Sequence, residues 1–530
     1  MTQQTSRFKS SIAAKIASGW TLERMTQPSR LFGANGLRKG ADGRIYVAQV
    51  SGSQVSAIDV NTGDIETISP LGGDIIAPDD LVFDPQGNLY VTEISEGRVG
   101  MRDTKGNYRV VNGEMPCANP ITFYNGRLFA GECRPGGRIM ELDLNGGPGR
   151  VIADNLMMPN AMEVGPDGKL YFPQMVTNEI CRVSLDGGPV EKVAGDLGVP
   201  DSVKFDAQGF IVSTQVASGQ VLRIDPRTGE KAILAQLSPG LDNLTFVGER
   251  LFVSNIGGTI DEVLGDGTSR SVVPDSLLFP LGLAVDTDGT LLIADGGFTY
   301  ALKNGKRHAL GMFFTPGYPG YVRGIVNAAA GEFVVTTSNG QVSRWWPAQQ
   351  EHEVLAEGFD RPYGVALTAN GTAIFADAGT GRVIAIQSSG VEILASDLQE
   401  PKGIAIAADG TCFVSEENTG RVLSVGRGKT ELVLDGLQQP QGLLARGDSL
   451  YIVDAGAKEI VEYNLAKKSQ RVIASGLPLG APAGVTPKFL KPFPPLSGSM
   501  GNFAGIAASA DGTLYISADG DGSVLALRAQ

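Results

Sequence analysis

Asparagine and aspartate recur at one position of a repeated unit in the first half of this chain. The stretches Pro159-Asn160 and Pro200-Asp201 each open a short apolar strand, which is followed by a glycine turn and a second strand. Aligning the units on the turn glycine, and allowing for short deletions in two turns, places these residues together: Asn35, Asp79, Asn119, Asn160, Asp201 and Asp242. Carboxylate and amide oxygens are the ligands that hard cations prefer. The pattern predicts a divalent-cation site, with Ca²⁺ expected and Mg²⁺ or Zn²⁺ as alternatives.

A second set of oxygen-bearing side chains ends the second strand of the same units: Gln49, Glu93, Glu132, Gln174, Gln215 and Asn255. If both sets face one opening, their carboxylates repel one another unless a cation neutralises them. The only histidines, His308 and His352, lie in the second half at positions expected in outer strands. A histidine-rich zinc site is therefore not expected.

Asn and Asp can also stand at such positions because their side chains bond to the local backbone of a turn. The second half of the chain serves as an internal comparison. Its equivalent positions are Leu281, Arg323, Tyr363, Lys402, Gln441 and Ala504. The same turns are thus expected there without Asn or Asp, which favours the cation site. Turn capping stays the alternative interpretation.

The elements that must position these residues follow from the repeat. Turn glycines such as Gly43, Gly87 and Gly289 recur about every 40 residues, and twelve copies span the chain. Each copy reads as four short antiparallel strands, which is typical of a β-propeller blade. We predict an all-β fold of two six-bladed propellers, over residues 1–276 and 277–530. The last copy lacks a fourth strand, and residues about 20–25 are expected to supply it.

Composition agrees with a soluble all-β protein. The 530 residues include 71 glycines and 29 prolines, which suits many short strands and tight turns. The formal net charge of −13 argues against nucleic-acid and anionic-membrane partners. Four cysteines without metal-like spacing are expected to be free thiols. No signal peptide or membrane span is recognised, so a cytoplasmic location is expected; the oligomeric state is not predicted.

Two features of the second half suggest another site. Arg323, Tyr363 and Lys402 would form a cationic mouth suited to an aromatic or carboxylate ligand, unless neighbouring acids simply pair with the cations. A Pro-rich insertion over residues 476–502 is expected on the mouth face of this second propeller. Its length favours a lid, with an interdomain spacer or packing arm as the alternative.

The Pro159-Asn160 and Pro200-Asp201 stretches, together with Asn119, resemble signatures of the regucalcin/gluconolactonase (senescence-marker-protein-like) family. Pro362-Tyr363-Gly364 and Pro401-Lys402-Gly403 are similar to NHL-type repeats. The first resemblance implies a six-bladed propeller with one divalent cation at its mouth and lactone hydrolysis. It implies Asn160 and Asp201 as metal ligands, Asn119 near the substrate and Asp201 as general base. Where that family has a Glu, this chain has Asn35, and Asp79 would replace it; the family's Arg corresponds to Cys117.

The leading functional hypothesis is a metal-dependent hydrolase of a lactone or related ester, acting on a small-molecule substrate. The cation would polarise the carbonyl, and Asp201, Glu93 or Glu132 would activate water. Two alternatives stay open. A lyase or hydrolase would work in the second mouth through Arg323, Tyr363 and Lys402, or the protein would bind a ligand or partner without catalysis.

Overall fold

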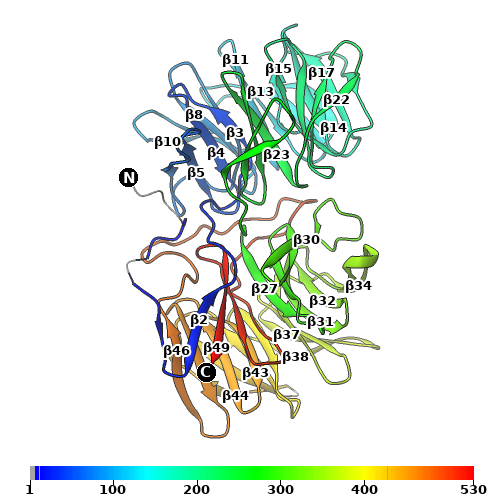
Figure 1. Ribbon diagram of the computed structural model, residues 1–530. Helices are drawn as coiled ribbons and strands as arrows, with labels where there is room; N and C mark the ends of the chain where they lie inside the picture. Colours follow the sequence, from blue (N-terminus) through cyan, green and yellow to red (C-terminus); the bar gives the residue numbers. More distant parts are fainter. Residues whose placement is uncertain (1–5, 11, 427) are drawn as a thin grey trace. The chain divides into compact units, whose positions relative to one another are not determined.

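The structure, a computed structural model, describes residues 6–10, 12–426 and 428–530. Over these residues the chain forms 49 strands and a single short 3-10 helix, η1 (Pro347–Gln349). The strands assemble into twelve separate antiparallel sheets, eleven of four strands and one of five. Figure 1 shows successive blades in order of colour along the chain. The predicted all-β fold of tandem propellers is confirmed.

The chain divides into two compact units. The first contains residues 30–275 and 485–495, and the second contains residues 6–29, 276–484 and 496–530. In unit 1 the innermost strand of the first blade, β3, packs against both β7 of the second blade and β23 of the last. In unit 2, β27 packs in the same way against β31 and β47. Each unit therefore closes on itself as a ring.

Unit 1 holds six of the sheets, each made from four consecutive strands. Its strands are β3 (Leu37–Lys39), β4 (Ile45–Gln49), β5 (Gln54–Ile58), β6 (Ile65–Ser69); β7 (Pro78–Phe83), β8 (Leu89–Glu93), β9 (Arg98–Arg102), β10 (Tyr108–Asn112); β11 (Ala118–Tyr124), β12 (Arg127–Glu132), β13 (Pro135–Leu142), β14 (Arg150–Met157); β15 (Glu163–Val164), β16 (Lys169–Gln174), β17 (Glu179–Ser184), β18 (Glu191–Ala194); β19 (Pro200–Phe205), β20 (Ile211–Gln215), β21 (Gln220–Ile224), β22 (Lys231–Gln236); β23 (Leu241–Val247), β24 (Arg250–Asn255), β25 (Ile260–Val263) and β26 (Ser269–Val273).

Unit 2 holds the other six sheets, and the N-terminal segment completes two of them. β2 (Trp20–Arg24) pairs with β49, so it is the outer strand of the last blade, where the sequence analysis placed it. β1 (Lys15–Ile16) adds a fifth strand to the blade before it, beside β46. The remaining strands are β27 (Pro280–Val285), β28 (Leu291–Asp295), β29 (Phe298–Lys303), β30 (Lys306–Met312); β31 (Val322–Ala329), β32 (Glu332–Thr337), β33 (Gln341–Trp346), β34 (Glu351–Glu357); β35 (Pro362–Leu367), β36 (Ala373–Asp377), β37 (Arg382–Gln387), β38 (Gly390–Ala395); β39 (Pro401–Ile406), β40 (Cys412–Glu416), β41 (Arg421–Gly426), β42 (Lys429–Leu434); β43 (Pro440–Arg446), β44 (Ser449–Asp454), β45 (Glu459–Asn464), β46 (Ser469–Ser475); β47 (Ile506–Ala508), β48 (Leu514–Ala518) and β49 (Ser523–Ala529).

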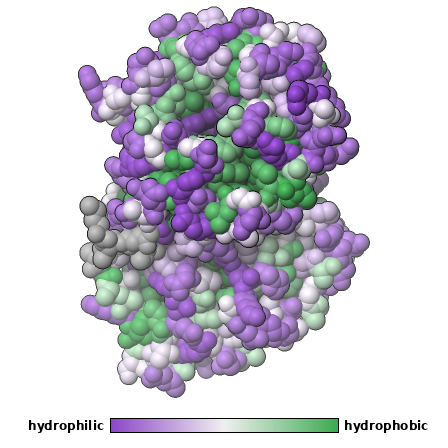
Figure 2. All heavy atoms as spheres, turned by 45° about the horizontal axis from the view of Figure 1, so that its top comes forward, coloured by the Kyte–Doolittle hydropathy of each residue, from purple (hydrophilic) through white to green (hydrophobic). Residues whose placement is uncertain are grey.

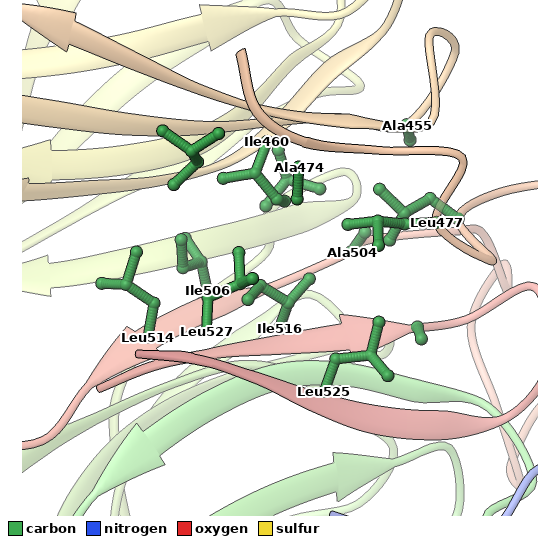
Figure 3. Close-up of a cluster of buried hydrophobic side chains, with 14 residues drawn as sticks. Ala455, Ile460, Ala474, Leu477, Ala504, Ile506, Leu514, Ile516, Leu525 and Leu527 are labelled. Carbon is green, nitrogen blue, oxygen red and sulfur yellow. The ribbon is translucent and has the colours of Figure 1, made fainter. Parts of the chain in front are cut away.

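The core lies between neighbouring blades, because the inner strands present apolar side chains on both faces. In the last blade of unit 2, Leu514 and Ile516 of β48 and Leu525 of β49 pack against Ile460 of β45 (Figure 3). Burying each such side chain contributes about 2 kcal/mol. The outermost strands are half exposed and polar, and hydrophilic side chains cover much of the face seen in Figure 2.

The insertion between β46 and β47, which we predicted on the mouth face of the second propeller, is divided between the two units. Residues 485–495 pack with unit 1, whereas residues 496–502 pack with unit 2. Its carbonyl oxygens and apolar side chains find partners in both units, which repeat spacing does not reveal.

No helix in the described part of the chain is long and apolar enough to cross a membrane.

Candidate functional site

The first mouth is a set of six side chains that lie in, or just before, the innermost strands of unit 1: Asn35, Asp79, Asn119, Asn160, Asp201 and Asp242. Hydrogen bonds across blades join five of them, all except Asp79. Asn119 donates from Nδ2 to Oδ1 of Asn160 at 2.8 Å, and Asn160 donates from Nδ2 to Oδ2 of Asp201 at 2.8 Å. On the other side, Asn35 donates to Oδ2 of Asp242 at 3.0 Å. Residues from successive blades are thus brought together as the sequence predicted.

Burial and neighbouring carboxylates raise the pKa of all three aspartates in the first mouth. Burial raises the pKa of Asp79 to about 7, and Asp80 adds to the effect. Burial also raises the pKa of Asp201, with contributions from Asp79 and Asp80. The pKa of Asp242 is raised by burial and then by Asp201 and Asp79. The mouth therefore favours protons or another positive charge in its centre.

Unsatisfied oxygens show where a cation would fit. Oδ1 of Asn119 and Oδ1 of Asp201 are buried and accept no hydrogen bond. Asn160 Oδ1, in contrast, already accepts from Asn119 and from the backbone N–H of Ala161. No three Asp, Glu, His or Cys side chains in the described chain are gathered so as to hold a metal by themselves. The donor chemistry fits a hard cation, provided that amide oxygens complete the set.

Below the first mouth, a charged layer fills the axis of unit 1. Arg38 Nη1 contacts Glu163 Oε2 at 2.9 Å, and Lys204 Nζ lies 3.2 Å from the same oxygen. Arg38 also lies 3.9 Å from Asp80, whose Oδ1 accepts from Asn243. Two cations and two acids balance, so this layer leaves the charge of Asp79, Asp201 and Asp242 uncompensated.

Glu93 and Glu132, expected as alternative bases, are engaged in other contacts. Arg98 contacts Glu93 at 2.7 Å, and Tyr108 also bonds to it. Glu93 further accepts from the backbone N–H of Ile76. Glu132 pairs with Arg134 at 2.9 Å and with Arg138. These ion pairs hold both carboxylates at the strand ends rather than in the hydrogen-bonded group of the mouth.

A pocket of about 640 Å³ lies in unit 1, lined in part by Cys117, Arg134 and Glu96. Pro492, Pro494 and Pro495 of the insertion form another part of its wall. Cys117 donates to the carbonyl oxygen of Pro494 at 3.4 Å, and Lys491 pairs with Glu96 at 2.7 Å. Burial raises the pKa of Cys117, and Asp79 of the first mouth acts in the same direction. The pocket thus lies within electrostatic reach of the mouth, and part of the insertion covers it.

The second mouth is the equivalent set in unit 2: Leu281, Arg323, Tyr363, Lys402, Gln441 and Ala504. Arg323 lies 4.7 Å and Lys402 3.8 Å from the ring centre of Tyr363. The structure therefore brings together three of the four predicted substrate-binding residues, whereas the fourth, Asn119, belongs to the first mouth. Residues 497–502 occupy the same place, where Ser499 accepts from Arg323 and Asn502 from Lys402. His308 and His352 lie in the outermost strands β30 and β34.

Comparison with known proteins finds a family match in the first half of the chain. Residues 13–256 match the family described as SMP-30/Gluconolactonase/LRE-like region. They form an SMP-30/gluconolactonase/LRE-like region. This confirms the family that the Asn160 and Asp201 stretches predicted, and the SMP-30-like region contains the whole first mouth. None of the curated proteins matches the sequence.

Solved structures similar to the chain each span about half of it. A streptogramin B lyase is 19% identical, covers 52% of this chain and 95% of its own, and has a TM-score of 0.39. An inactive virginiamycin B lyase from Staphylococcus aureus, crystallised with quinupristin, is 18% identical over 52% of this chain and 96% of its own, with a TM-score of 0.39. A candidate gluconolactonase is 16% identical over 49% of this chain and 95% of its own, with a TM-score of 0.38.

Sequence reasoning missed the charged layer below the first mouth. Its signal was present, because Arg38, Glu163 and Lys204 each stand three residues after a mouth residue, Asn35, Asn160 and Asp201 respectively. A charged side chain in a buried strand is costly unless an opposite charge lies beside it. The shared spacing places Arg38, Glu163 and Lys204 at the same depth of the ring. The sequence also could not show that residues 497–502 would enter the second mouth, since no local pattern encodes that contact.

Proposed function

We propose that the SMP-30-like region is a metal-dependent hydrolase of a lactone or related ester. The observation that carries the proposal is Asp201, which is 5% exposed, bonded through Oδ2 to Asn160, and left with an unpartnered Oδ1. A buried carboxylate with one free oxygen can accept a proton from a water molecule beside it, and a bound cation would counteract the burial that raises the pKa of Asp201. A small-molecule substrate would enter through the pocket beside Cys117 and Arg134.

The groups proposed to hold a divalent cation, Ca²⁺ first, are Asp201 and Oδ1 of Asn119, whose oxygens are free, with Asp79 or Asp242 as a further carboxylate. Such an ion, when bound, would polarise a substrate carbonyl and stabilise its developing oxyanion. Asn160 would act as a positioning residue, because it donates to Asp201 and accepts from Asn119. Asn35 would likewise orient Asp242.

The pocket wall supports recognition of a polar substrate. Arg134 pairs with Glu132 through one Nη, and its Nε is buried without a partner. It lies beside Cys117, the position at which the resemblance led us to expect an Arg. We propose that Arg134 orients the substrate in place of that residue.

All four cysteines, which the structure describes, are free thiols, which supports the proposal of a reducing, cytoplasmic location.

The test is hydrolysis of a panel of simple lactones and aryl esters with Ca²⁺, Mg²⁺ or Zn²⁺ added to chelator-treated protein. Asp201→Ala is expected to lower kcat/KM by about 10²- to 10⁴-fold, because it removes the proposed base. Asp154→Asn, an exposed residue of the same unit, is the matched control and should behave as wild type. Turnover that is unaffected by Asp201→Ala, or by chelation, would contradict the proposal.

A further inference from the structure

Arg323 is a buried cation without a counter-charge. It is fully buried in β31 and forms no ion pair with any described residue. Its guanidinium donates to the carbonyl oxygen of Pro362 at 3.4 Å, to the carbonyl oxygen of Ser499, and to the hydroxyl of Ser499 at 3.3 Å. Because an uncompensated buried charge is costly, its presence here needs an explanation.

The neighbouring acids do not supply that counter-charge. Glu417 contacts Lys402 at 3.3 Å, and Glu400 contacts Arg361 at 2.6 Å and Lys402 at 3.7 Å. Asp295, whose charge acts on Tyr321, accepts instead from the backbone N–H groups of Leu278 and Phe279. None of these three acids contacts Arg323, so no described acid supplies a counter-charge to its guanidinium.

Two unpartnered groups point to an acceptor in the same place. Nε of Arg323 and the hydroxyl of Tyr321 are buried and form no hydrogen bond. They stand two residues apart at the start of β31, where alternate side chains point to the same side, and Arg323 opposes the rise that burial gives the pKa of Tyr321. Both groups can donate, and both lack an acceptor. A carboxylate, with its two oxygens and single charge, would satisfy both.

Aromatic rings surround these donors. The ring of Tyr363 lies between Arg323 and Lys402, and Phe503 lies 5.8 Å from it between ring centres. Phe313 lies 6.2 Å from Tyr321. Such walls suit a flat apolar body attached to the anion.

Residues 497–502 now fill this place with backbone oxygens. Ser499 and Asn502 present carbonyl oxygens to Arg323 and Lys402. The segment, Ser-Gly-Ser-Met-Gly-Asn, forms no helix or strand; it contains one bend, and Ser497 and Met500 form isolated β-bridges. We propose that the second mouth binds a small aromatic carboxylate monoanion, and that residues 497–502 occupy the site and leave it when that ligand binds. This site is separate from the one proposed for hydrolysis.

Benzoate is the probe, and its neutral analogue benzamide tests the need for charge. A Cβ at Gly498 would lie 1.8 Å from the carbonyl oxygen of Ser338, so Gly498→Ala should loosen the segment and tighten benzoate binding about tenfold. Gly426→Ala, whose Cβ would meet nothing closer than 3.7 Å, is the matched control. Arg323→Met should abolish binding. Equal affinity for benzamide, or benzoate binding that neither Gly498→Ala nor Arg323→Met alters in calorimetry, would overturn the proposal.

A reversible lock gives a second measurement that does not depend on the folding of Gly498→Ala. Oγ of Ser338 and Oγ of Ser497 lie 3.2 Å apart, so the pair Ser338→Cys and Ser497→Cys can form a disulfide. The oxidised protein should bind benzoate at least about tenfold more weakly than the same protein after reduction. Identical affinity before and after reduction would show that the segment need not move, and would overturn the proposal.

Discussion

At the scale of single residues, the first mouth is distinguished by three carboxylates that have no cationic partner among the described residues. Asp79, Asp201 and Asp242 share one opening, and no described Lys or Arg pairs with them. Their pKa values rise because burial, and then repulsion by neighbouring carboxylates that include Asp80, disfavour the ionised forms. The sequence predicted these residues from a shared turn position, but it could not predict which oxygens would stay free. That depends on distances across blades, as in the bond from Asn160 to Asp201.

The raised pKa of Asp79, about 7, predicts how stability depends on pH. The unfolded chain releases this proton near its ordinary value, whereas the folded protein retains it until about pH 7. The cation-free protein should therefore lose stability as pH rises from about 4 to 7. Asp79→Asn should remove part of that loss and stabilise the protein at pH 8 by on the order of 1 kcal/mol. Urea unfolding at both ends of this range measures it; equal pH slopes for the variant and wild type would contradict it.

At the scale of elements, the innermost strands β3, β15 and β19 carry charged residues whose ion pairs connect different blades of unit 1. Glu163 is shared by Arg38 and Lys204, and its pKa is lowered because these two cations outweigh the effect of burial. The repeat predicted the strands and their order, because glycine turns recur with the blade period. The ion pairs across the ring involve residues far apart in sequence, so the repeat could not predict them.

Glu163→Gln should leave two buried cations without their common acid and lower the free energy of unfolding by roughly 3 kcal/mol. Glu191→Gln is the control, because Glu191 pairs with Lys169 and Arg182 at the surface of the same blade. The control should lose less than about 1 kcal/mol. Urea denaturation followed by circular dichroism compares the two; losses of equal size would contradict a stabilising role for the buried layer.

At the scale of the whole molecule, the order of segments along the sequence differs from their order around the propellers. β2, near the N-terminus, closes the last blade of unit 2, and the insertion before that blade contributes residues to both units. The sequence predicted the closing strand from the missing fourth strand of the last repeat. It did not predict the division of the insertion, because prolines and glycines indicate a loop without indicating what the loop packs against.

All three tryptophans, Trp20, Trp345 and Trp346, lie in unit 2, so their fluorescence reports the unfolding of that unit. Leu22 of β2 packs against the core beneath the last blade. Leu22→Ala should lower the stability of unit 2 by about 2 kcal/mol, less than a fully buried leucine would, because the site is half exposed. Ile12→Ala, at a position that is 64% exposed, is the control. An unchanged fluorescence midpoint for Leu22→Ala would contradict the closing role of β2.

Calorimetric titration of Ca²⁺ into the chelator-treated protein tests the proposed cation site most directly. Wild type should bind one ion per chain in the first mouth, with affinity rising as pH increases through about 7, because the ion competes with the protons held there. Asp201→Asn should bind at least about tenfold more weakly, while Asp154→Asn should match wild type. Ca²⁺ binding that is absent from wild type, or equally tight in Asp201→Asn, would contradict a cation site in the mouth of the SMP-30-like region.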